Sequence, residues 1–199
     1  MKRTIVPTLT TIAFVFAPVI AFAHPGHGGA DGMIQGFAHP ISGIDHVLAM
    51  VAVGLLAAQF GGRALWLVPL SFVSMMAVAG AVAMSGIRIP LAEFGIASSV
   101  VVLGLAVAFR FSLSVFAAMA LASFFAVFHG YVHGAELPAG VPHLLYAAGF
   151  VGATMLLHTA GIGLGLFADQ AGGKIANSVL RAGGGAAALF GIAVISGLF

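Results

Sequence analysis

The amino-acid sequence predicts an all-α, polytopic membrane helix bundle with six transmembrane helices after a cleaved signal peptide. Hydrophobic residues make up 61% of the 199 residues and charged residues only 6%, whereas a soluble domain has roughly 25% charged residues. The apolar residues form long runs, suited to helices that cross ~30 Å of hydrocarbon. The alternating pattern of a transmembrane barrel is not visible, and helices are then the structure that satisfies the backbone in lipid.

The first segment, residues 1–23, has the layout of a secretory signal peptide. Lys2 and Arg3 precede an apolar stretch and the small-residue sequence Ala21-Phe22-Ala23, matching a charged n-region, an h-region and an A-x-A cleavage site. An uncleaved first transmembrane helix is the alternative, although the apolar run is short of the ~20 residues of a span. Cleavage would leave a mature chain that starts at His24.

Residues 24–36 are predicted to form a His/Gly-rich periplasmic N-terminal tail. The sequence HPGHGG places His24 and His27 close to the new α-amine, on a backbone rich in Gly and Pro. Such a tail could hold a metal ion loosely as an auxiliary site. A tail without a binding role is an equally acceptable interpretation.

Residues 37–199 are predicted to form one six-helix transmembrane domain. Short polar or Gly/Pro breaks separate its apolar runs, which cover residues 37–58, 64–84, 91–109, 112–132, 142–167 and 176–198.

The basic residues predict the orientation. If the mature N-terminus is exported, the breaks with Arg63, Arg110, Lys174 and Arg181 face the cytoplasm, and only Arg88 faces outward. This distribution obeys the positive-inside rule. We therefore expect a multi-pass protein of the bacterial inner membrane with a periplasmic N-terminus.

Two polar runs within apolar surroundings carry the candidate metal ligands. HPISGIDH and FHGYVHGAE contain His39, Asp45, His46, His129, His133 and Glu136. The predicted orientation brings both runs to the periplasmic end of the bundle. An unpaired ionised carboxylate within the membrane costs at least ~2.5 kcal/mol on insertion scales, so Asp45 should have a partner.

The spacing and residue types predict a site for a transition-metal dication. His129 and His133 stand at i and i+4, so they are neighbours on one helix face. Histidine nitrogen with nearby carboxylate suits Ni²⁺, Co²⁺, Zn²⁺ or Cu²⁺, whereas Mg²⁺ and Ca²⁺ prefer more oxygen ligands. The chain has no cysteine, which excludes thiolate ligands. Glu93 is interpreted first as a helix-capping acid and second as an auxiliary ligand.

The fifth span suggests a route inward. His143 lies at its outer end and His158 fifteen residues later, about 22 Å along a helix and ~60° around its axis. Both could line one pathway for the metal. The alternative is that each imidazole bonds a neighbouring helix.

Other partners receive no support from the sequence. Without Lys2 and Arg3 the chain has five basic and five acidic residues, so the basic face of a nucleic-acid-binding protein is missing. No Walker sequence GxxxxGK[ST] is present, which argues against ATP. A homo-oligomer remains open.

Two segments, HPISGIDHVLAMVAVG at 39–54 and FHGYVHGAE at 128–136, resemble the hydrogenase/urease accessory family HupE/UreJ. The resemblance extends to the signal peptide, the HPGHGG start and the six-helix plan. Members of that family are regarded as nickel, and sometimes cobalt, permeases that supply nickel–iron hydrogenase or urease. The resemblance implies that the six candidate ligands are the functional positions.

The sequence therefore predicts a permease, not an enzyme, with no prosthetic group. It would move a divalent metal, Ni²⁺ first and Co²⁺ or Zn²⁺ second, from periplasm to cytoplasm. One alternative is a zinc-dependent intramembrane hydrolase, in which Ser42 could assist a metal-bound water. The other is a periplasmic-facing accessory protein that binds metal without transporting it.

Overall fold

The computed structural model describes residues 30–171 and 174–198, and each regular element in these ranges is an α-helix. The helices are α1 (Ala30–Ser42), α2 (Ile44–Phe60), α3 (Ala64–Met84), α4 (Ala92–Phe109), α5 (Val115–Ala135), α6 (His143–Gln170) and α7 (Lys174–Ile195). The predicted all-α class is confirmed. The predicted signal peptide, His24 and His27 lie outside the described residues.

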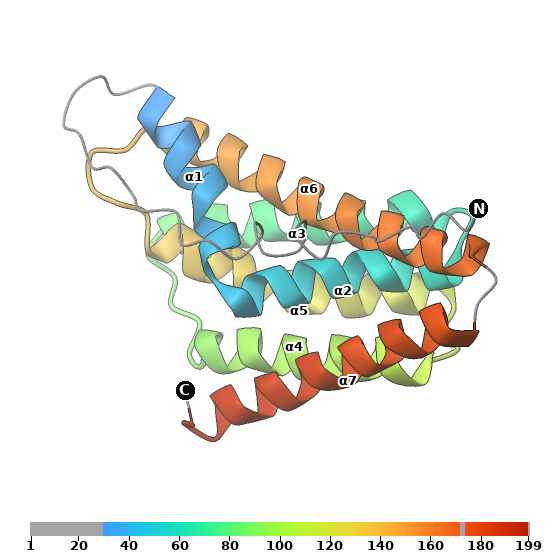
Figure 1. Cartoon of the computed structure of the whole chain (residues 1–199). Helices are drawn as coiled ribbons and strands as arrows, with labels where there is room; N and C mark the ends of the chain where they lie inside the picture. Colours follow the sequence, from blue (N-terminus) through green and yellow to red (C-terminus); the bar gives the residue numbers. More distant parts are fainter. Residues whose placement is uncertain (1–29, 172–173, 199) are drawn as a thin grey trace, which may run out of the picture.

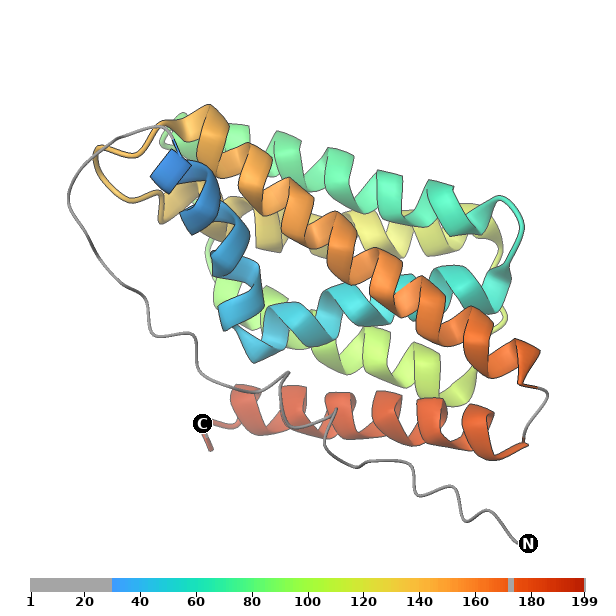
Figure 2. The same cartoon turned by 45° about the horizontal axis from the view of Figure 1, so that its top comes forward.

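Helices α2 to α7 run roughly along a common direction, and α1 is set at a steep angle to α2 at one end of the bundle (Figures 1 and 2). The main helix pairs are α3 with α5, α4 with α7, α2 with α6, and α1 with α6. Helix α2 also packs on α3 and α4. Because it is enclosed in this way, α2 is largely buried from Ala49 to Ala58.

The outer surface of the bundle is apolar. Large side chains such as Phe116, Leu144 and Phe167 are more than two-thirds exposed, as expected for surfaces that face lipid. Helices α3 to α7 are each long and apolar enough to cross a membrane. The protein is therefore a multi-pass membrane protein, with five such helices, or up to six spans if α1 and α2 together form one.

The first predicted span, residues 37–58, is not one continuous helix. Residues 31–42 and 44–60 form two helices that meet at 83°. The break lies at Gly43, whose backbone is extended with φ −95° and ψ 116°. Pro40 lies inside α1 and not at the break. The run HPISGIDH thus contains a sharp bend between two helices. Helix α1 begins at Ala30, within the segment predicted to be a tail.

Close backbone contacts hold α1 on α6. A Cβ atom at Gly36 would collide with the backbone of Tyr146, and one at Gly149 with the backbone of Met33. Glycine removes the side chain that would separate the two helices. This contact places the end of α1, with His39, over the first turns of α6.

The fourth predicted span, 112–132, is displaced along the chain to residues 115–135. The helix continues through Gly130 and Gly134, where the sequence allowed unwinding. A Cβ atom at Gly130 would collide with the backbone of Met76, and one at Gly134 with the backbone of Gly80. Tight packing against α3 therefore keeps α5 helical up to and beyond His133.

Candidate metal centre

Three buried histidines meet between α2 and α5. His46, His129 and His133 each offer a ring nitrogen, and these nitrogens lie within 4.8 Å of one another. The ring centroid of His46 is 4.9 Å from that of His129 and 4.6 Å from that of His133. Exposed fractions of 9%, 0% and 5% show that protein covers all three residues. We call these three residues the histidine centre.

The histidine centre contains nitrogen atoms without hydrogen-bond partners. Within the described residues, His46 Nε2, His129 Nδ1 and both ring nitrogens of His133 are buried and unpaired. Leaving such a group unsatisfied costs about 1–3 kcal/mol, and most buried polar atoms are paired. Several converging lone pairs fit a transition-metal ion, since neutral imidazole is a metal ligand. The donor set therefore fits the metals predicted from the sequence.

Asp45 pairs with its neighbour in the chain. Its Oδ1 atom lies 2.9 Å from Nδ1 of His46 and accepts the His46 backbone N–H at 2.8 Å. The acceptor orients the imidazole and places the hydrogen on Nδ1, leaving the lone pair on Nε2. Asp45 is therefore the partner of a candidate ligand, and the predicted need for pairing is met by His46.

His39 reaches the histidine centre from α1. Its ring centroid lies 4.7 Å from that of His133, and it also contacts Tyr146 and Phe150 of α6. Its side chain is half-buried. His39 lies outside the group of converging nitrogens, so the structure places it beside the centre.

Two further carboxylates lie at the same end of the bundle as the histidine centre. Glu136 follows the last residue of α5 and is exposed; it interacts electrostatically with His39. Glu93, in the first turn of α4, interacts electrostatically with Glu136, His46 and Asp45. The structure thus places Glu136 outside the histidine centre. It places Glu93, which the sequence analysis interpreted mainly as a helix-capping acid, near the other carboxylates. We call Asp45, Glu93 and Glu136 the acidic rim.

The two histidines of α6 have different environments. His143 is exposed and, with His133, lines a cavity of about 260 Å³ between α3, α5 and α6. His158 is 1% exposed, does not line that cavity, and both of its ring nitrogens are unpaired in the described part of the protein. The fully buried ring of Phe72 contacts both His129 and His158, with centroid distances of 5.5 and 5.2 Å.

Ser99 of α4 is a contact of the centre that sequence reasoning did not single out. Its hydroxyl oxygen lies 3.0 Å from Nε2 of His129, and the residue is fully buried. Serines within apolar helices commonly bond their own helix. The sequence alone therefore does not distinguish a serine that also contacts a histidine of another helix.

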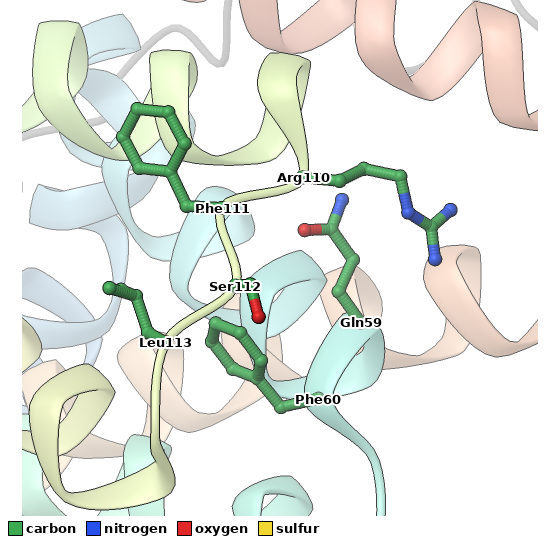
Figure 3. Close-up of a pocket in the computed structure, with 6 residues that line it drawn as sticks. All are labelled: Gln59, Phe60, Arg110, Phe111, Ser112 and Leu113. Carbon is green, nitrogen blue, oxygen red and sulfur yellow. The ribbon is translucent and has the colours of Figure 1, made fainter.

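A second cavity, of about 210 Å³, lies at the other end of the bundle (Figure 3). It is lined by residues at the end of α2 and after α4: Gln59, Phe60, Arg110, Phe111, Ser112 and Leu113. The Gln59 amide nitrogen donates to the Val107 carbonyl at 3.2 Å, and Arg110 donates to Asn177 at 2.9 Å. This cavity contains no histidine or carboxylate, so it does not compete with the histidine centre as a metal site.

Comparison with known proteins covers most of the chain. No solved structure matches the chain. Protein HupE of Rhizobium leguminosarum bv. viciae is 46% identical over 188 residues, which cover 94% of this chain and 96% of that protein. The family model described as HupE / UreJ protein matches residues 12–194. The chain therefore belongs to the HupE/UreJ family.

Proposed function

We propose that the protein is an inner-membrane permease that carries a divalent transition metal, Ni²⁺ or the similar Co²⁺, into the cytoplasm for hydrogenase or urease maturation. One observation carries this proposal: three imidazoles from two helices converge in the interior of a multi-pass bundle with unpaired nitrogens. Membership of the HupE/UreJ family supports it. The metal is the substrate, and no resident cofactor or catalytic step is required.

Capture begins at the carboxylates of the outer end. Glu93 interacts electrostatically with both Asp45 and Glu136. Within the described residues, neither Glu93 nor Glu136 forms a salt bridge with a lysine or arginine. Uncompensated negative charge at a low-dielectric mouth raises the local concentration of cations. The rim therefore delivers a dication to the histidine centre.

Nitrogen ligands then replace part of the water shell of the ion. His46 offers Nε2, and its Nδ1–H is held by Asp45. His133 has both nitrogens unpaired and lies against His39, so His39 can join or leave the ion by a small movement of its ring. A carrier needs such exchangeable ligands, because an ion that binds too tightly cannot leave.

His158 is the next nitrogen ligand on the proposed route. Phe72 contacts both His158 and His129, so on the proposed route the ion passes along this ring. The other end of the bundle carries Arg63, Arg110 and Arg181, which we assign to the cytoplasm by the positive-inside rule. The proposed direction is therefore from the acidic rim, through the histidine centre, to the basic end.

The Phe72 ring also favours a second candidate, a periplasmic-facing protein that binds metal without transporting it. A fully buried apolar ring that contacts both His129 and His158 is compatible with a closed binding site. The hydrolase alternative gains no such support. Ser42, its suggested assistant, donates its hydroxyl to the His39 carbonyl at 2.6 Å.

The deciding experiment is uptake of radiolabelled Ni²⁺ by cells that express the protein, with membrane levels confirmed by immunoblot. We expect His46→Ala and His133→Ala to abolish uptake, with Co²⁺ as the best competitor. Ser98→Ala, on α4 and without a side-chain hydrogen bond to any described residue, should transport normally. Ni²⁺ binding to purified protein without any uptake would favour the binding protein, and absence of both would reject the metal proposal.

A further inference from the structure

Ser99 makes the one side-chain hydrogen bond of His129 among the described residues, between its Oγ and Nε2 at 3.0 Å. Both residues are fully buried, so the contact is shielded from solvent. The remaining ring contacts of His129 are with His46 and Phe72. The tautomer of His129 therefore depends on whether the Ser99 hydroxyl donates a hydrogen bond to it or accepts one from it.

The hydroxyl hydrogen of Ser99 already has an acceptor. Its oxygen lies 2.6 Å from the backbone carbonyl oxygen of Ile96, one turn earlier in α4. A carbonyl oxygen can only accept, and a serine hydroxyl has one hydrogen. The shorter of the two contacts, 2.6 Å against 3.0 Å, assigns the hydrogen to Ile96, so that Ser99 meets His129 as an acceptor.

The hydrogen between Ser99 and His129 must then come from the imidazole. A neutral imidazole has one N–H and one lone pair, so an N–H at Nε2 leaves the lone pair on Nδ1. Nδ1 is the nitrogen of His129 that has no partner within the described residues. The nitrogen that carries the lone pair is thus also the one left without a hydrogen-bond partner, and it is available to a metal ion.

His46 has the opposite arrangement. Asp45 accepts from its Nδ1, and its free nitrogen is Nε2. Each of these histidines therefore has one nitrogen engaged by a partner and the other left free, although the partners come from different helices. A hydrogen-bonded partner of this kind fixes the ring tautomer and raises the basicity of the ligand.

We propose that Ser99 is a positioning residue that holds His129 as its Nε2–H tautomer, so that the transported dication binds His129 through Nδ1. The assignment rests on the proposed function, because it presumes that the histidine centre binds metal. Loss of a partner of this kind typically weakens metal binding by about 10–100-fold. Without the hydroxyl, Nε2–H would be left buried and unpaired, and the alternative tautomer would withdraw the lone pair from the ion.

A purely structural role for Ser99 is the competing explanation, because serine often bonds the preceding turn of its own helix. Ser98 offers a matched control: it is the adjacent residue of α4, it is half-buried, and its side chain has no hydrogen bond in the described part of the chain. Ser99→Ala and Ser98→Ala each remove one hydroxyl group from α4. Ser99→Thr keeps the hydroxyl and tests rescue.

The experiment uses purified full-length protein in lipid nanodiscs, with ¹⁵N-labelled histidine. Long-range ¹H–¹⁵N spectra identify the tautomer of His129 without metal, and calorimetry gives the Kd for Ni²⁺. We expect Nε2–H in the unaltered protein and in Ser98→Ala, and mixed tautomers in Ser99→Ala with a Kd about 10–100-fold weaker. Ser99→Thr should restore both the tautomer and most of the affinity.

The outcomes separate the inference from the proposed function. An Nδ1–H tautomer in the unaltered protein, or an unchanged Kd in Ser99→Ala, would overturn the role of Ser99 while leaving metal binding intact. Failure of the unaltered protein to bind Ni²⁺, Co²⁺ or Zn²⁺ would overturn the proposed function, and the assignment of Nδ1 as a ligand with it.

Discussion

Phe72 packs edge-on against His158, with ring centroids 5.2 Å apart and ring planes at 89°. The same phenyl ring contacts His129 of the histidine centre at 5.5 Å. Both His158 and Phe72 are almost completely buried. On the proposed route, an ion that moves from the histidine centre toward His158 therefore passes along this apolar ring.

His158→Ala tests whether transport uses the deeper histidine. Because His158 lies beyond Phe72 and outside the group of converging nitrogens, its loss should leave the Kd for Ni²⁺ nearly unchanged and lower the uptake rate about tenfold or more. That loss corresponds to roughly 1.4 kcal/mol of barrier. Thr159→Ala, an exposed neighbour on α6, is the control. Undiminished uptake by His158→Ala would make the residue a packing element.

Asp45→Asn tests the carboxylate that orients His46. The amide oxygen can still accept the Nδ1–H and backbone N–H hydrogen bonds, so the fold should persist. The charge that strengthens the imidazole and attracts the ion is lost. We expect the Ni²⁺ concentration for half-maximal uptake to rise about tenfold or more, with a smaller change in maximal rate. An unaltered half-saturation concentration would show that the charge of Asp45 is not used.

Hydropathy predicted most of the bundle because the bilayer itself sets helix length. The span predicted at 64–84 coincides with α3 (Ala64–Met84), whose run has sharp boundaries. The sequence did not reveal the corner at Gly43, since one glycine in an apolar run is compatible with a continuous helix. The backbone contacts of α1 with α6 accompany this turn, and the sequence alone does not reveal them.

The sequence also predicted part of the arrangement of the candidate site. Periodicity placed His129 and His133 on one helix face, and topology placed His46 at the same end of the bundle. The contribution of Ser99 depends on which face of α4 meets α5, and no periodic signal in an apolar helix reports that. The rim position of Glu136 likewise depends on α5 ending one residue earlier.

Gly130→Ala tests the backbone contact that positions α5. Because a Cβ atom there would collide with the Met76 backbone, α3 and α5 must separate, and overpacking of this kind costs about 1–3 kcal/mol or more. We expect a lower midpoint of thermal unfolding in detergent and weaker Ni²⁺ binding. Gly163→Ala adds the same methyl group where nothing lies within 4 Å, and it should not lower the midpoint. Equal midpoints for the two variants would contradict the role of this contact.

Glu136→Gln tests whether the rim attracts cations through charge and not through direct ligation. Glu136 is exposed and lies outside the histidine centre, so its charge should affect the rate of capture more than the affinity of the buried site. Uptake at limiting Ni²⁺ should fall about two- to fivefold at low ionic strength. The deficit should shrink near 0.15 M salt, because screening over about 8 Å weakens the rim of the unaltered protein as well.

Asp169→Asn is the matched control for that variant, because Asp169 is an exposed carboxylate near the end of α6. The end of α6 and the end of α5 lie at opposite ends of the bundle (Figure 1). Removing its charge should leave uptake unchanged at every salt concentration. If the deficit of Glu136→Gln persisted at high salt and appeared as a weaker Kd, the carboxylate would be a direct ligand. The ion would then first bind at the junction of α5 and its following loop, before His39 and His133 receive it.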